Sequence, residues 1–141
     1  MDGFNFPGLY EMKQIETAPH THVLKQEGMN VCYVAFNVDR KPFGDKRVRQ
    51  AVNYAINKQR ILAEQYQGFG VVAKNPIPPV LWGYNDAIED YSYDPAKAKT
   101  LLAEAGFPAG FETTLWVMPN PRPYLLEPDK VGAAILADLE A

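Results

Sequence analysis

The chain has 141 residues, of which 47% are hydrophobic and 22% charged, and its formal net charge is −3. This length and composition suit one globular domain with a core of its own. Acidic and basic residues are interspersed, so the sequence lacks the basic footprint of a protein that binds nucleic acid or an anionic membrane. No stretch approaches the roughly 18 apolar residues that a membrane-spanning helix needs.

The N-terminus and the single cysteine bear on the compartment of the protein. The first residues, MDGFNFPGLY, have neither the basic start nor the apolar stretch of a secretory signal peptide. We therefore expect either a cytoplasmic protein or a chain that begins downstream of its export signal. Cys32 lies in the apolar run 31–36, which favours a buried thiol over a nucleophile, and one cysteine excludes an intrachain disulfide.

In chain order, the first elements change from helical to extended spacing. Apolar residues three apart predict a short helix over residues 9–17, which Pro19 ends. Residues 22–25 suit a short strand. The stretch VCYVAFNV at 31–38 is rich in β-branched and aromatic residues and predicts a strong strand.

The run KPFGDKRVRQAVNYAINK at 41–58 couples a turn to a helix start. Pro42 and Gly44 break the preceding strand, and Asp45 is placed to cap the helix that follows. One apolar face is expected to be buried, with the polar residues of the run pointing away from it; the face consists of Val48, Val52, Ala55 and Ile56. A second helix is predicted over residues 59–67, closed by Gly68.

Residues 68–94 read mostly as a loop, because the pairs Asn75-Pro76 and Pro78-Pro79 exclude regular structure. The loop carries several aromatic residues. Two interpretations remain open: a ligand-facing or transporter-facing surface, or a wrap that shields the helix after it. The wrap is the favoured one, because tyrosines suit a wet loop packed on a helix.

The remaining elements complete an α/β pattern. Asp94 and Pro95 predict the start of a helix that ends at Ala105, the stretch FETTLWVM at 111–118 alternates as a strand does, and residues 129–141 form a final helical pattern. We expect helices packed on a mixed sheet. Only two strands are strongly predicted, and a sheet usually has more, so the pattern suggests part of a larger protein whose other parts supply strands.

Four stretches of the sequence resemble, in order and with similar spacing, the periplasmic solute-binding proteins of peptide-importing ABC transporters, which include dipeptide- and oligopeptide-binding proteins. The dipeptide-binding branch is the most similar, since NPIPP, WGYN and the sequence MP followed by RPY are typical of it. The stretches are YVAFNVDRKPFGDKRVRQAVNYAINKQRI at 33–61, AKNPIPPVLWGYN at 73–85, DYSYDPAKAKTLLAEAGF at 90–107 and LWVMPNPRPY at 115–124.

The resemblance implies a periplasmic-binding-protein-like lobe that is incomplete relative to the full two-lobe fold. Residues 1–30 would be the end of the preceding lobe or a hinge-linked segment, and residues 31–141 part of the second large lobe. The expected partners are a short peptide, the missing lobe of the same protein and the membrane permease of an ABC transporter. The full-length protein is expected to be periplasmic or extracytoplasmic, with its signal peptide absent from this chain.

The peptide's terminal carboxylate points to Arg122, because a guanidinium fork matches carboxylate geometry and stays charged. Pro121 and Pro123 restrict the backbone on both sides of it. In the dipeptide-binding relatives an arginine in the matching RPY block pairs with the ligand carboxylate, and the alternative is a solvated loop arginine. Tyr124 and Trp116 could wall the pocket, although Trp116 suits the core equally well. The relatives usually continue RPY with Asn-Pro, whereas Leu125 and Leu126 follow here.

Other chemistry has little support in the sequence. His20 and His22 are spaced like a metal-ligand pair but lack a third ligand, so surface histidines are favoured and no metal or cofactor is expected. Arg47 and Arg49 could steer anions, but pairing with neighbouring acids is favoured. No nucleophile, base or metal constellation marks an enzyme. The alternative to peptide capture is a stand-alone structural or interaction domain that keeps the lobe fold without binding a ligand.

Overall fold

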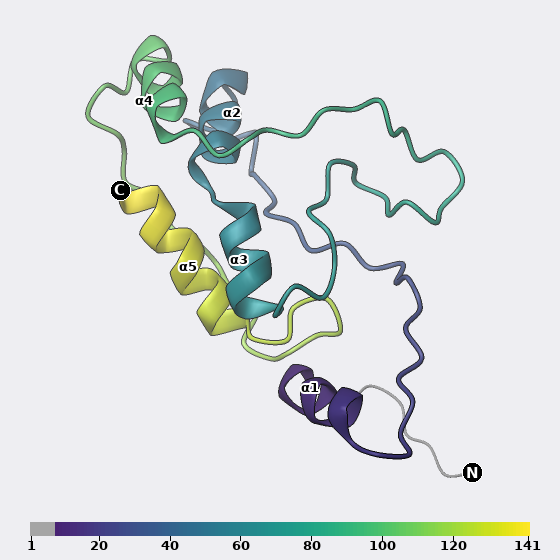
Figure 1. Cartoon of the computed structure of the whole chain (residues 1–141). Coiled ribbons are helices and arrows are strands. Elements are labelled where there is room, and N and C mark those ends of the chain that lie inside the picture. The colour runs from purple at the N-terminus through teal and green to yellow at the C-terminus, as the bar shows by residue number, and fades with distance from the viewer. Residues whose placement is uncertain (1–7) are drawn as a thin grey trace.

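The computed structural model describes residues 8–141, and in this range it contains five helices joined by extended segments (Figure 1). None of these helices is long and apolar enough to cross a membrane. The helices are α1 (Leu9–Thr17), α2 (Lys46–Ala55), α3 (Lys58–Gln65), α4 (Pro95–Glu104) and α5 (Pro128–Glu140).

Helices α2 and α4 lie side by side and form the most extensive helix pair (Figure 1). Their contact is made of small and β-branched side chains: Val48 and Ala51 of α2 are 0% and 1% exposed, and Ala98 of α4 is 3% exposed. Small side chains allow the two backbones to approach closely. Asp94 ties the start of α4 to α2, because its backbone N–H donates to the Tyr54 carbonyl at 2.8 Å.

Helices α3 and α5 form the second pair, and a small apolar cluster lies at their contact. The pair is fastened by Asp138 of α5, which is paired with Arg60 at 2.7 Å and accepts the backbone N–H of Asn57 at 2.9 Å. The buried members of the cluster are Ile56, Ile61, Leu125, Val131 and Ala134, and the half-buried side chains packed on it are Val52, Tyr66, Tyr124 and Ile135.

The predicted helix starts are confirmed in atomic detail. The Asp45 carboxylate accepts the backbone N–H of Arg47 at 2.8 Å, and the Asp94 carboxylate accepts that of Lys97 at 2.9 Å. All five predicted helices form, and their ends differ from the prediction by at most two residues. Ala51, which the predicted apolar face omitted, is among the most buried residues of α2.

The mixed sheet is not confirmed. Within residues 8–141 the segments 22–25, 31–38 and 111–118 form no strand, and 22–36 and 111–118 run as irregular, mostly extended chain. A strand needs a neighbouring strand to take up its backbone hydrogen bonds, and these segments have none beside them. The same cause makes the expectation of a buried Cys32 wrong, since the thiol of this segment is exposed.

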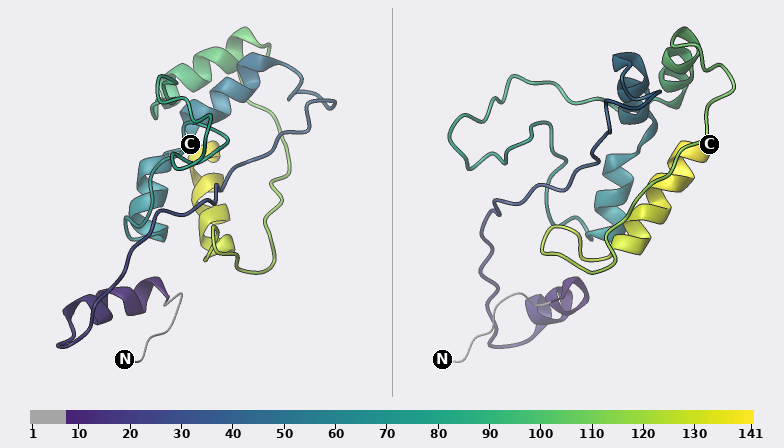
Figure 2. Two further views of the ribbon diagram at one scale, coloured as in Figure 1. Left: turned by 90° about the vertical axis from the view of Figure 1, so that its right-hand side faces the viewer. Right: turned by 180° about the vertical axis from the view of Figure 1, so that it is seen from behind.

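Helices α2 to α5 are called the helical body below. The long loop 68–94 projects from it, so the favoured interpretation of a loop wrapped on α4 is wrong (Figures 1 and 2). Trp82 is 99% exposed, so it shields no helix. The loop is braced across its own two arms: Lys74 bonds to Asp86, and the Asn75 amide donates to the Asn85 carbonyl at 3.0 Å. Its shape is therefore held locally.

Candidate functional site

The segment around Arg122 forms a tight turn closed by two backbone hydrogen bonds. The Arg122 N–H donates to the Leu125 carbonyl, and the Leu125 N–H donates to the Arg122 carbonyl, both at 2.9 Å. Pro121 and Pro123 fix φ on either side of Arg122. The backbone that carries the arginine is thus restricted before any ligand arrives.

The turn is also fastened to the helical body. Leu125, 8% exposed, is part of the apolar cluster between α3 and α5. The hydroxyl of Tyr66, just past the end of α3, donates to the Tyr124 carbonyl at 3.0 Å. Burial, followed in importance by the neighbouring Cys32 thiol, raises the pKa of Tyr66, so the hydroxyl stays protonated and keeps its role as donor.

The Arg122 side chain itself is exposed. Its guanidinium makes one long contact, from Nη1 to the carbonyl of the adjacent Pro121 at 3.5 Å. In residues 8–141 no carboxylate forms an ion pair with it, whereas Arg47 and Arg60 are both paired with acids. A charged fork on a fixed turn, without an internal counter-ion, is suited to an anionic group from outside.

Tyr124 lies beside Arg122 in the turn and is half buried. Its ring packs against the apolar cluster, and its hydroxyl reaches the Met118 sulfur at 3.8 Å. The tyrosine therefore links the turn to the end of the extended segment 111–118. It presents a partly exposed aromatic ring two positions after Arg122.

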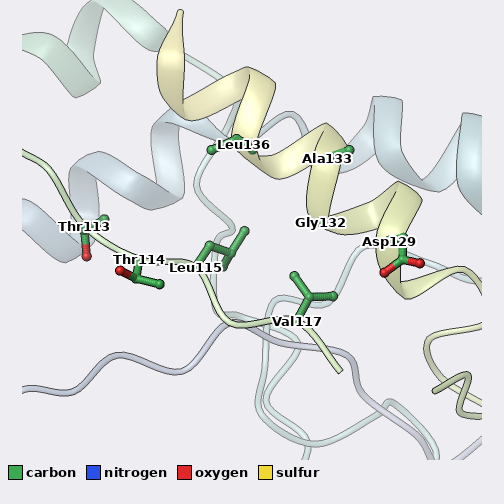
Figure 3. A pocket seen from close by; sticks show the side chains of 8 residues that line it. All are labelled: Thr113, Thr114, Leu115, Val117, Asp129, Gly132, Ala133 and Leu136. Atoms are coloured by element: carbon green, nitrogen blue, oxygen red, sulfur yellow. The ribbon is translucent and has the colours of Figure 1, made fainter. Parts of the chain in front are cut away.

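Trp116 is 89% exposed, so the alternative of a core tryptophan is not what the structure contains. Segment 111–118 runs along α5, and Leu115 and Val117 face this helix across an open hollow of about 420 Å³ (Figure 3). Side chains of extended chain alternate, so Trp116 faces the other way. The hollow is lined by Thr113, Thr114, Leu115, Val117, Asp129, Gly132, Ala133 and Leu136.

The segment comes this close to α5 because Gly132 has no side chain. A Cβ atom at Gly132 would lie 2.7 Å from Cγ2 of Val117.

Of the three site residues predicted from the sequence, the structure brings Arg122 and Tyr124 together in one turn. In residues 8–141, Trp116 stacks on no other aromatic ring, and no hydrogen bond joins it to the turn.

The other residues considered from the sequence have structural surroundings. Arg47 pairs with Asp45 and donates to the Glu104 carbonyl at the end of α4, and Arg49 donates to the Phe43 and Gly44 carbonyls. In the described range no group of His, Cys, Asp and Glu could hold a metal ion. His20 and His22 are exposed.

Tyr66, which anchors the turn, was not predicted from the sequence. Tyr66 is 58 residues from Tyr124 in the chain, and a tyrosine at the end of a helix gives no signal of the carbonyl that its hydroxyl will meet. Only the packing of α3 against the turn brings the two together. Nothing in the local sequence pattern could have identified this contact.

The class of fold is defined by comparison with solved structures. The ABC transporter-associated periplasmic binding protein DppA from Helicobacter pylori, solved in complex with the peptide STSA, matches 95% of this chain with a TM-score of 0.78 and 37% identity. The match covers 26% of that protein. The chain therefore has the fold of one part of a periplasmic binding protein.

The family follows from the sequence. The model of the bacterial extracellular solute-binding proteins, family 5 (middle), matches residues 1–141, and the chain belongs to this family. It is 49% identical over 133 residues to heme-binding protein A of Haemophilus influenzae and 45% identical over 133 residues to the dipeptide-binding protein of Escherichia coli. Each match covers 94% of this chain, and the chain spans about a quarter of the length of these curated relatives, 24% and 25%.

Proposed function

We propose that this chain is part of a substrate-binding protein that captures short, dipeptide-like peptides for import by an ABC transporter. The observation that carries the proposal is the exposed Arg122 guanidinium on a braced turn, with no acidic partner in residues 8–141. The names of relatives in the same family, one binding dipeptides and one associated with an ABC transporter, support it. The protein acts as a binder and carries out no chemical step.

In this proposal Arg122 holds the terminal carboxylate of the peptide. A carboxylate needs two donors in one plane, and the guanidinium supplies them at every physiological pH. Tyr124 forms a wall next to the carboxylate, and Trp116 walls the peptide from the extended segment. Main-chain contacts and end-charge pairing leave the peptide side chains free to vary.

The missing neighbours of the extended segments suggest how the complete protein is organised. We infer that residues 1–30 end the preceding lobe and that residues 31–141 are part of the second large lobe. Segments 31–38 and 111–118 then pair with strands from elsewhere in the longer protein to form the mixed sheet. The complete protein works in the periplasm, where the loaded form meets the membrane permease.

The test is the substitution Arg122→Ala in the complete protein. We expect the free energy of dipeptide binding to weaken by about 2–4 kcal/mol, within the range for truncating one partner of a charge pair that is buried in the complex. Isothermal titration calorimetry with Ala-Ala measures it. Arg40→Ala is the matched control, since Arg40 is also an exposed arginine of a turn but lies far from 121–125 in the chain.

Two outcomes would contradict the proposal. Unchanged affinity in Arg122→Ala would remove this arginine from the site. A wild-type protein that binds no dipeptide but binds haem, the ligand named for the relative from Haemophilus influenzae, would replace the substrate class.

A further inference from the structure

Residues 121–125 are called the arginine turn below. In residues 8–141, one side-chain hydrogen bond from a distant part of the chain reaches this turn, and the Tyr66 hydroxyl is its donor. This bond spans 58 residues and ends on the carbonyl of Tyr124, two positions from Arg122. Tyr66 directly follows α3 and packs against the apolar cluster, so the donor is held at the end of this helix. The contact therefore joins the end of α3 to the turn that carries Arg122.

Several constraints act on the turn, and they differ in what they fix. The prolines limit φ at two positions, and the Arg122–Leu125 hydrogen bonds close the turn on itself. Neither of them sets how the closed turn is oriented on the body. The contacts that do so are the Tyr66 hydroxyl, the burial of Leu125 and the packing of the Tyr124 ring on the apolar cluster.

We propose that Tyr66 is a positioning residue for carboxylate recognition: its hydroxyl, by donating to the Tyr124 carbonyl, orients the turn and so aims the Arg122 guanidinium. This inference rests on the proposed function. Without the hydroxyl the turn samples more orientations, and binding a carboxylate must then restrict them again. Affinity for the free carboxylate falls, while contacts elsewhere on the peptide are unaffected.

Tyr66→Phe in the complete protein tests this, because the phenylalanine ring keeps the packing and loses only the hydroxyl. The probes are Ala-Ala and its C-terminal amide, measured by calorimetry. We expect Ala-Ala to bind roughly two- to ten-fold more weakly, the effect of one neutral hydrogen bond. We expect the amide to bind as it does to wild type, so that the preference for the free carboxylate shrinks by the same factor.

The matched control is Tyr91→Phe. Tyr91 lies near the end of the long loop, and its ring packs edge-on against Tyr54 of α2, with the ring centroids 5.1 Å apart. This substitution should change neither affinity. The double variant Arg122→Ala/Tyr66→Phe should bind Ala-Ala as Arg122→Ala alone does, since a hydroxyl that acts through the guanidinium has no effect once the guanidinium is gone. Melting temperatures of the variants check that the fold is kept.

The outcomes separate this inference from the proposal on which it rests. If Tyr66→Phe weakens acid and amide equally, or changes neither, or weakens Ala-Ala further in the double variant, the positioning role is wrong. If Arg122→Ala leaves the preference for the free carboxylate intact, the proposed function of Arg122 fails instead.

Discussion

The helical body and the extended segments of this chain differ in how their backbone N–H and C=O groups are hydrogen-bonded. In α2 to α5 the helices bond internally, and side chains such as Asp45 and Asp94 take up the first free N–H groups. Segments 22–36 and 111–118 leave their peptide groups unpaired with other backbone in the described range. They also expose large apolar side chains, among them Tyr33, Val34, Trp116 and Val117.

The difference shows which elements form from local contacts and which need a partner from elsewhere in the chain. A helix is built from contacts within about four residues, so a piece of a longer protein can specify it completely. A strand depends on a neighbour that is remote in the chain. The relatives are about four times longer than this chain, and we infer that the neighbours lie in that additional length.

The largest expected effect is on amide hydrogen exchange. In a protein of residues 1–141 alone, the amides of 31–36 and 111–118 should exchange as fast as unstructured chain. In the complete protein we expect them to be slower by about three orders of magnitude, once strands have paired with them. Mass-spectrometric exchange on both proteins measures this. Equal exchange rates in the two proteins would mean that these segments gain no strand partner in the complete protein.

The second effect concerns the core of the helical body. Ile61 of α3 is 8% exposed and belongs to the cluster that joins α3, α5 and the arginine turn. Ile61→Ala should lower the free energy of unfolding by about 2–4 kcal/mol, because it leaves a cavity there. Urea denaturation followed by circular dichroism measures the loss.

Val71→Ala serves as the control for this substitution. Val71 is 72% exposed in the long loop, so its truncation should change the unfolding free energy by less than about 0.5 kcal/mol. Equal losses in the two variants would mean that the cluster does not hold the body together.

The smallest effect is a pH dependence at the start of α2. The hydrogen bonds from Arg47 hold the pKa of Asp45 below its usual value of 3.8. Because the folded-state pKa is the lower one, the stabilisation by Asp45 is complete above the unfolded pKa and is lost as pH falls through the folded one. Asp45→Asn keeps a cap that does not titrate. On acidification the wild type should lose exchange protection at the first turn of α2 in a step that the variant lacks, and identical profiles would contradict this.

The helices could be predicted because their signals are local. Asp45 and Asp94 precede apolar periodicity, Pro95 stands at the first position of α4, and Gly106 follows its end with φ of +90°. Each of these residues acts within one turn of its own position. The arginine turn was predictable for the same reason, since two prolines flank Arg122.

The remaining features depend on tertiary contacts. The alternation at 111–118 predicted a strand, which the segment does not form in the described residues, and the exposure of Trp116 depends on which side of the segment faces α5. The loop around Trp82 was expected to cover a helix, because tyrosines suit a wet loop packed on a helix. Its shape is held by braces such as Lys74 with Asp86, which a sequence pattern does not reveal.

Gly132 fixes where the end of the extended segment 111–118 contacts α5. The absence of one methyl group lets Val117 rest on α5, and Arg122 stands only five residues further along the chain. An added side chain would push the segment outward and change where the stretch that leads to Arg122 begins. A position with no side chain thereby sets where the chain that continues to Arg122 leaves α5.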